Sequence, residues 1–480
     1  MTSKQVESVH EASLEILENV GVLVRNQEAR QLYVQHGCEE EIESSVIKFP
    51  RAVVEQFRQS IPSSFTFHGR DPSFDRTIPE DGPIFCTGSS APDIFDLESN
   101  EVRRSRSDDI ARIAHLVNEL PGYDLFAISV TADDAPDGQQ SLSRFYPALK
   151  NCQKPVYGSA PSIDEVFDIL KLCFLIAGRE AAFWERPFIC LGYCPVISPL
   201  TMDVESTEKL IRFTELGVPC YGVMAPTAGL SAPLTLTGSL ALTNAEFLAQ
   251  TTLEQILKPG KPIIYEALPT VVDVRNGAYS PGGIETGILL MGCAQMADFY
   301  NIPSGGFAGL TNAKSSDVQS GFETGMSSVA ALLAGLDLLR IGGLLDALKI
   351  FDFSKVVIDN EIALMLKQAA RGIQFSEDNL ALDTIAETGP GGTFLNKSHT
   401  IERMRTTPFL PDIADRLSWS QWKTGGAITP QAQALNRVRE ILSVDNPAVF
   451  SAEVDQSIRE EFVGLVAGDS LPIAASMKPI

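Results

Sequence analysis

Residues 107–372 alternate between two hydrophobic patterns. Short apolar runs such as "YDLFAISVT", "RPFICLGYCP" and "KPIIYEALP" are typical of buried strands, and each is followed by a longer segment with helical spacing. Prolines suit the start of a strand, where a missing N–H does least harm, and they recur at Pro155, Pro187, Pro219, Pro262 and Pro303. Seven strand–helix units end at Gly372, and we expect a less clear eighth unit in the remainder of the chain.

Eight such units predict an α/β fold, a TIM (β/α)8 barrel. An open doubly wound sheet is the alternative, but no strand is followed by the glycine fingerprint of a dinucleotide site. The first 105 residues differ, because helical patterns at 4–20 and 26–35 give way to short strands and turns. We therefore predict residues 1–105 as an N-terminal α+β extension, with helices and short strands packed on the barrel. Residues 106–480 are predicted to form the barrel and a C-terminal helical segment.

Charge and cysteine usage restrict the function. The 480 residues include 38 Lys and Arg against 61 Asp and Glu, a formal net charge of −23, which would repel nucleic acid. The chain starts with an amphipathic helical pattern and not with a secretory signal, and its longest uncharged run, 217–244, contains several prolines. We expect no nucleic-acid or membrane partner. The eight cysteines form no CxxC pair, which indicates reduced thiols and a cytoplasmic location.

The motifs of several common enzyme classes are missing. The chain has five histidines, three of them before residue 100, so we expect no metal bound directly. Cys190, Cys194 and Cys220 lie near successive strands and are interpreted as buried thiols. Without a GxSxG or HExxH motif, His399 in "GPGGTFLNKSHT" has no evident nucleophile to serve. A hydrogen-bonding role in a loop over the barrel mouth is favoured over general base catalysis.

Aromatic residues recur at the strand ends, where the site of a TIM barrel lies. Four tyrosines lie in or toward the ends of successive strands and a phenylalanine follows on the next: Tyr157, Tyr193, Tyr221, Tyr265 and Phe307. Any one of them could simply pack in the core, since aromatic residues favour strands. As a group they predict an aromatic cage, which is suited to a quaternary ammonium group.

Polar side chains at or after the strand ends complete the predicted site. Those predicted as catalytic contacts are Glu266, Asp346 and His399. Asn312, in the loop after the sixth of these strands, is predicted to bind substrate together with the aromatic cage. A lone carboxylate at such a position could instead cap a helix or form a structural ion pair.

Seven stretches of the chain, taken in order, resemble one known family. They are "HEASLEILENVGV" at 10–22, "DLESNEVRRSRSDDIARIAHL" at 96–116, "KNCQKPVYG" at 150–158, "GLSAPLTLTGSLALTNAEFLA" at 229–249, "NAKSSDVQSGFETG" at 312–325, "VIDNEIA" at 357–363 and "GPGGTFLNKSHT" at 389–400. Together they resemble the trimethylamine methyltransferase (MttB-like) family from near the first residue to about residue 425.

The resemblance implies a TIM barrel that moves a methyl group from a methylated amine to the Co(I) of a separate corrinoid protein. The implied cofactor is a corrinoid (cobalamin) carried by that cognate protein, the implied substrate is a small quaternary amine, and a homo-oligomer is expected. The trimethylamine enzymes of methanogens carry pyrrolysine, and this chain has no such residue. It is therefore similar to the non-pyrrolysine branch, whose substrates include glycine betaine and related quaternary amines.

The implied chemistry agrees with a site poor in histidine. A quaternary ammonium leaves as a neutral tertiary amine, so displacement of its methyl group by Co(I) needs neither acid nor base. The enzyme must hold the methyl group in line and exclude water. Two alternatives stay open: a barrel lyase or aldolase with Lys314 as the candidate Schiff-base lysine, or a non-catalytic barrel that binds betaines.

Overall fold

The computed structural model describes residues 1–466 and 468–471. Eight parallel strands form one sheet in the order β6-β20-β19-β16-β14-β11-β10-β9, and a bridge between Cys86 and Leu125 joins its two edges. The sheet thus closes into a barrel, which confirms the predicted TIM-barrel fold. Its strands are β6 (Ile84–Cys86), β9 (Phe126–Ala127), β10 (Val156–Gly158), β11 (Ile189–Tyr193), β14 (Cys220–Met224), β16 (Tyr265–Ala267), β19 (Ser304–Gly306) and β20 (Leu338–Arg340).

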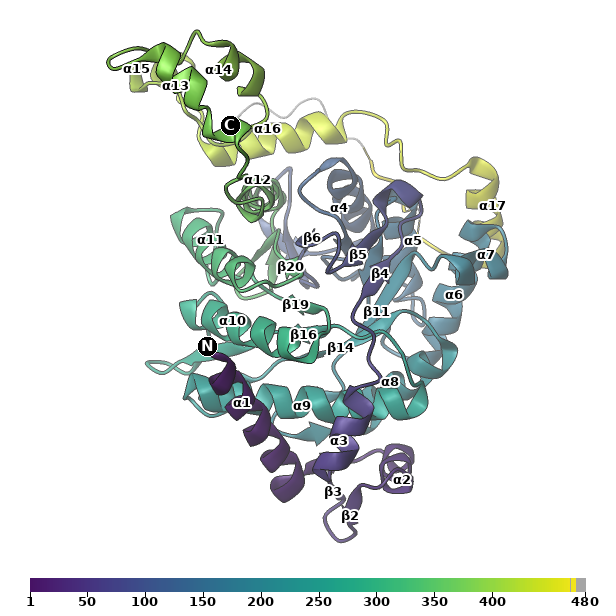
Figure 1. Cartoon of the computed structure of the whole chain (residues 1–480). Coiled ribbons are helices and arrows are strands. Elements are labelled where there is room, and N and C mark those ends of the chain that lie inside the picture. The colour runs from purple at the N-terminus through teal and green to yellow at the C-terminus, as the bar shows by residue number, and fades with distance from the viewer. Residues whose placement is uncertain (467, 472–480) are drawn as a thin grey trace.

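Each barrel strand is followed by a long helix that packs on the outside of the sheet (Figure 1). The helical periodicity of these segments buries one face against the strands, as the hydrophobic pattern predicts. In strand order the helices are α4 (Ser107–Glu119), α5 (Leu142–Asn151), α6 (Ile163–Ala177), α8 (Val204–Leu216), α9 (Leu236–Leu257), α10 (Ile284–Tyr300), α11 (Val318–Leu333) and α12 (Phe353–Ala370).

The barrel begins earlier than the sequence indicates. Its first strand, β6, lies within the stretch 1–105 that was predicted as an extension. The sequence analysis expected the eighth strand–helix unit after Gly372, but the structure forms this unit from β6 and α4. In the described part of the chain, no barrel strand follows β20. A hairpin at 93–104 separates β6 from α4, so the pattern of a strand followed directly by a helix is missing here.

The residues before β6 cover one helix and close one end of the barrel. Helices α1 (Ser3–Glu15), α2 (Gln27–Gln35) and α3 (Arg51–Arg58) all pack against α9. The hairpin of β4 (Phe65–Phe67) and β5 (Arg76–Ile78) lies at the N-terminal ends of the strands. There the rings of Phe65 and Phe67 meet Tyr221 edge-on at 5.8 and 6.4 Å. The hairpin thus covers the N-terminal end of the barrel, and a cavity opens at the C-terminal ends.

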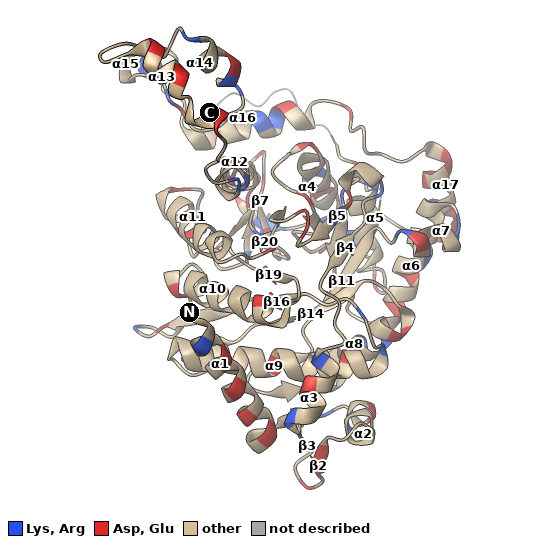
Figure 2. Cartoon of the chain, viewed as in Figure 1, with Lys and Arg blue, Asp and Glu red and all other residues tan. Residues whose placement is uncertain are grey.

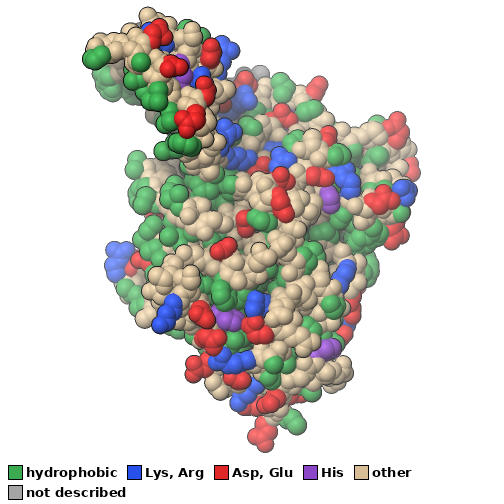
Figure 3. Space-filling model, in the orientation of Figure 1, with side chains coloured by type: hydrophobic (Ala, Val, Ile, Leu, Met, Phe, Trp, Pro, Cys, Tyr) green, Lys and Arg blue, Asp and Glu red, His purple; other side chains and the backbone are tan. Residues whose placement is uncertain are grey.

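The chain after α12 is helical. Helix α16 (Pro430–Leu442) packs on α12 and α4, and α17 (Ala452–Glu461) packs on α6. Between α12 and α16 an arm extends away from the barrel, with α13 (Leu382–Thr388), α14 (Ser398–Arg403) and α15 (Trp419–Thr424) (Figure 1). Figure 3 shows hydrophobic side chains on the surface of this arm and of the barrel helices nearest to it.

Charged residues lie mainly on the outer helices, as Figure 2 shows for α1 and α17. None of the described helices combines the length and the apolar character that a membrane crossing requires.

Candidate active site

A cavity of about 680 Å³ opens at the C-terminal ends of the barrel strands. One wall is apolar and is formed by Val223, Leu268, Phe307 and Leu348. Three of these side chains, those of Val223, Leu268 and Phe307, belong to one buried cluster against which Leu348 packs. This wall comes from the strands and loops of β14, β16, β19 and β20, on one arc of the barrel. It offers contact to methyl groups and almost nothing that could hydrogen-bond.

The opposite part of the lining is polar and carries two cations. Arg144 stands in the first turn of α5, Lys209 stands on α8, and both line the cavity beside Gln140 and Ser159. Neither cation forms an ion pair with any described residue. Burial lowers the pKa of Arg144 to about 10, so its guanidinium is charged at neutral pH. The cavity therefore has one hydrophobic side and one positive side.

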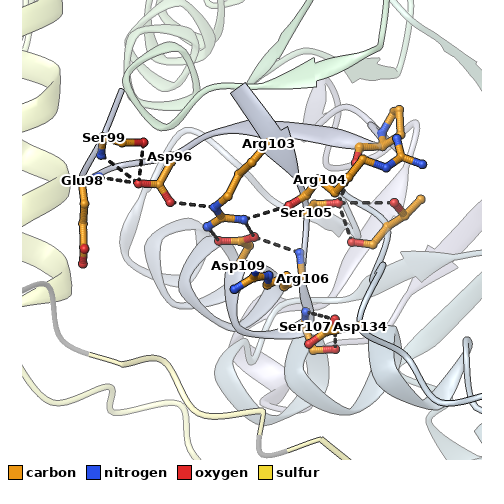
Figure 4. A network of polar contacts seen from close by, with 12 residues as sticks. Asp96, Glu98, Ser99, Arg103, Arg104, Ser105, Arg106, Ser107, Asp109 and Asp134 are labelled. Atoms are coloured by element: carbon orange, nitrogen blue, oxygen red, sulfur yellow. Dashed lines mark hydrogen bonds and ion pairs between the residues drawn. The ribbon is translucent and has the colours of Figure 1, made fainter. Parts of the chain in front are cut away.

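The only carboxylate among the described lining residues is that of Asp133, in the loop after β9. It lies 3.5 Å from the guanidinium of Arg104. Two hydrogen bonds hold this loop: Ser105 Oγ donates to the carbonyl of Thr131 at 2.7 Å, and the N–H of Asp133 donates to the carbonyl of Ser105 at 3.0 Å. The N–H and the Oγ of Ser107 both donate to the carboxylate of the next residue, Asp134, at 2.8 and 3.0 Å (Figure 4). The segment that leads into α4 therefore sets the position of the cavity wall that carries Asp133.

That segment is itself fixed by a charged network (Figure 4). Arg103, at the end of the hairpin of β7 (Asp93–Phe95) and β8 (Val102–Arg104), donates to Asp96 at 2.7 Å and to both oxygens of Asp109 at 2.7 and 2.8 Å. Partial burial opposes the charge on Asp96, but hydrogen bonds from Ser99 and Arg103 lower its pKa to about 2. The network joins the hairpin to the first turn of α4 and positions the cavity wall indirectly.

A second arginine forms the floor beneath the cavity. Arg340 of β20 is fully buried and donates from Nε to Glu266 at 2.6 Å and from Nη2 to the hydroxyl of Tyr221 at 2.6 Å. The guanidinium also lies 3.9 Å from the ring centre of Tyr157 and 5.2 Å from that of Phe307. Burial raises the pKa of Glu266. Burial disfavours the charged form of Arg340 as well, but the nearby Tyr221 and Glu266 raise the pKa of Arg340 well above its usual value. The floor is a compact ion pair enclosed by aromatic rings.

A glycine makes room for this arrangement. A Cβ atom built on Gly192 of β11 would lie 1.7 Å from the hydroxyl oxygen of Tyr157, so only glycine admits the ring here. The other contacts of Tyr157 are a stacked Tyr221, with ring centres 5.5 Å apart, and the guanidinium of Arg340. The ring of Tyr157 is therefore packed against both Tyr221 and Arg340.

Comparison with known proteins assigns the chain. A model of the trimethylamine methyltransferase (MTTB) family matches residues 1–465. This chain belongs to the trimethylamine methyltransferase family. It is 30% identical over 461 residues to the glycine betaine methyltransferase of Desulfitobacterium hafniense (strain Y51), with 96% of this chain and 95% of the relative covered. It is 31% identical over 462 residues to the trimethylamine methyltransferase MttB of Methanosarcina thermophila, with 94% of each covered. The family resemblance of the sequence is confirmed, and the chain is a methyltransferase of this family.

The structure brings together part of the predicted aromatic cage. Tyr157, Tyr193 and Phe307 border the cavity of this family member. Tyr221 lies in the floor below, and Tyr265 faces away from the cavity, where its ring packs 4.2 Å from Phe247 of α9. Even Tyr193 has its hydroxyl bound between Glu254 and Lys261. A ring of tyrosines open to a ligand is not what the fold produces.

The polar residues predicted from the sequence lie outside the cavity lining. Glu266 is paired in the floor, and Asp346 forms an ion pair with Lys314 at 2.7 Å in the loops. Asn312 accepts from the N–H of Gly282 at 2.9 Å and donates to a backbone carbonyl at 3.0 Å, so its amide fixes loop structure. Lys314, the Schiff-base candidate, is largely exposed and does not line the cavity.

His399 is not at the barrel mouth, where the sequence analysis expected it. It belongs to α14 in the arm and lines a separate pocket formed by residues 368–408. Nothing in the sequence shows that the helix after "GPGG" leaves the barrel, because its apolar residues have helical spacing whether they face a core or solvent.

Sequence reasoning missed the three cations that define the site. Arg340 had a usable signal, since a charged residue inside the apolar strand "LLRIGG" has to be paired. Arg144 and Lys209 had none, because basic residues near helix starts are common on surfaces. The described residues contain no group of three or more His, Cys, Asp or Glu side chains placed to hold a metal ion.

Proposed function

We propose that this methyltransferase takes a methyl group from a quaternary amine, glycine betaine or a related betaine, and transfers it to the Co(I) centre of a separate corrinoid protein. One observation carries the proposal: the cavity offers an apolar wall and no histidine or unpaired carboxylate among its described lining residues. The glycine betaine methyltransferase of D. hafniense, a relative over nearly the whole length, supports the choice of substrate.

The reaction balances without a proton. The C–N bond breaks, its electron pair stays on nitrogen, and a neutral tertiary amine leaves. The partner's corrinoid supplies the electron pair that forms the new bond to the methyl carbon. The remaining requirements, orientation of the methyl group and exclusion of water, fall on this chain.

The apolar wall is suited to a charge that disappears during the reaction. An unpaired carboxylate beside the ammonium would stabilise the ground state more than the transition state. The carboxylate predicted for this position is that of Glu266, but it forms an ion pair with Arg340 at 2.6 Å. Phe307 and Leu268 can hold methyl groups by dispersion and by a weak cation–π contact. Since the β4–β5 hairpin closes the other end, the corrinoid protein must approach over the C-terminal ends of the strands.

The test is an anaerobic assay with glycine betaine and chemically reduced cob(I)alamin, free or on a corrinoid protein from the same source. We expect methylcobalamin in the absorbance spectrum and dimethylglycine in equal amount. Phe307→Ala should lower kcat/KM about tenfold or more, because it removes part of the wall. The matched control, Phe375→Ala, removes an exposed phenylalanine of the arm and should leave the rate unchanged. Turnover of trimethylamine with none of any betaine would overturn the proposal.

A further inference from the structure

Arg144 is a partly buried cation that forms no ion pair with the described residues. Its Nε atom is buried and has no hydrogen-bond partner in the part of the chain that the structure describes, and its only hydrogen bond is a long one, 3.5 Å from Nη1 to the carbonyl of Ser159. Glu165 acts on it electrostatically, but that carboxylate is already bonded to the N–H of Ser141 at 2.6 Å. The guanidinium faces the cavity with most of its donors free.

The surroundings of Arg144 favour an anion. Lys209 lines the same side of the cavity and has no ion-pair partner among the described residues. Arg144 and Ser206 lie in the first turns of α5 and α8, so the positive ends of two helices face this side. The chain as a whole carries a net charge of −23, yet the lining holds two cations and one paired carboxylate. The local charge is opposite in sign to the global one.

An unpaired guanidinium whose Nε is buried is destabilising, and it cannot lose its proton to relieve the cost. A planar fork of donors matches a carboxylate with two parallel hydrogen bonds. A ligand carboxylate would therefore supply what the fold leaves out. Across the cavity, the apolar wall of Val223, Leu268 and Phe307 is matched to methyl groups.

We propose that Arg144, assisted by Lys209, binds the carboxylate of the substrate and makes the cavity specific for quaternary amines that carry one. This inference rests on the proposed function for the ammonium half of the substrate. It fixes the orientation of a betaine, with its carboxylate at α5 and α8 and its methyl groups against the wall formed after β14, β16 and β19.

Isothermal titration calorimetry on the full chain tests the assignment with three probes: glycine betaine, choline and acetate. Choline has the same trimethylammonium group without a carboxylate, and acetate has only the carboxylate. The wild type should bind glycine betaine at least tenfold more tightly than choline, and acetate should compete with glycine betaine. Arg144→Met should weaken glycine betaine binding about 10- to 100-fold and leave choline unchanged.

Two further variants keep the test decisive. Arg144→Lys retains the charge but not the fork and should fall between the wild type and Arg144→Met. Arg179→Met, which removes an exposed arginine outside the cavity, is the matched control and should bind as the wild type does. In the methyl-transfer assay, Arg144→Met should raise KM for glycine betaine far more than it lowers kcat.

The outcomes separate the two proposals. Equal loss of glycine betaine and choline binding in Arg144→Met, or no loss of either, would overturn the carboxylate site. So would a wild type that binds choline as well as glycine betaine, a result that needs no variant. A carboxylate-dependent affinity without methylcobalamin formation would uphold the site and overturn the proposed reaction instead.

Discussion

The floor of the barrel contains a fully buried arginine and the mouth a partly buried one, and the two differ in what surrounds them. Arg340 in the floor bonds to Glu266 and Tyr221 and is enclosed by rings, whereas Arg144 at the mouth has one long contact to a carbonyl. The difference lies in whether the fold itself supplies the counterion.

A buried carboxyl group shows where this lesson does not apply. Glu246 of α9 is fully buried without a cation, and it accepts from Ser198 Oγ at 2.7 Å and from the N–H of Leu200 at 2.9 Å. A carboxyl group can take up a proton when burial disfavours its charge, and a guanidinium cannot lose one. The absence of a counterion thus indicates a ligand for Arg144 but not for Glu246.

The largest expected effect comes from breaking the paired charge of the floor. Arg340→Met leaves Glu266 buried and unpaired, and we expect the free energy of unfolding to fall by about 3–5 kcal/mol. Urea unfolding followed by circular dichroism measures it. The same substitution at the mouth, Arg144→Met, removes a charge that has no partner and should cost little stability.

The double variant Arg340→Met, Glu266→Met is the control for the floor, since replacing both partners by apolar groups should restore much of the loss. If Arg340→Met and Arg144→Met destabilise the protein equally, the distinction between floor and mouth is wrong.

The fold was largely predictable because its strongest signals are local. Seven long helices with regular spacing, each after an apolar run, identify most of the barrel, and the missed unit is the one whose strand, β6, is not followed directly by its helix. A hairpin between β6 and α4 further hides the unit, because it separates the strand from its helix.

The site was predictable only in part, and Tyr221 and Tyr265 show why. Strands of a parallel barrel are buried on both faces, so their sequences do not alternate between apolar and polar residues. A shift of one position then decides whether a tyrosine points into the barrel or toward a helix. Tyr221 points inward to Arg340, and Tyr265 points outward to Phe247. Arg144 could not be found at all, because its role follows from a missing partner.

The pH dependence of stability tests the contrast between the carboxyl and the guanidinium. Burial raises the pKa of Glu246 to about 7, although hydrogen bonds from Leu200 and Ser198 oppose the shift. The folded chain then holds a proton that the unfolded chain releases near pH 4.5, so the contribution of Glu246 to stability declines as the pH rises from about 4.5 to 7. The total change is on the order of 3 kcal/mol.

Urea unfolding of the wild type and of Glu246→Gln at several pH values measures this contribution. The free energy of the wild type, taken relative to the variant, should fall across that window and level off above it. A difference that is constant or rises with pH would mean that Glu246 stays charged, and that a buried carboxylate without a cation can persist in this fold.

The smallest expected effect tests whether the floor is rigid. In Gly192→Ala the new Cβ would meet the hydroxyl of Tyr157 at 1.7 Å, and Tyr157 cannot yield easily because its ring packs against Tyr221 and Arg340. We expect a loss of about 1–3 kcal/mol in urea unfolding, the usual range for an overpacked core. The matched control is Gly321→Ala on α11, where a Cβ meets nothing within 4 Å and the helix should gain slightly. If the two variants are equally stable, Tyr157 moves freely and the floor is not rigid.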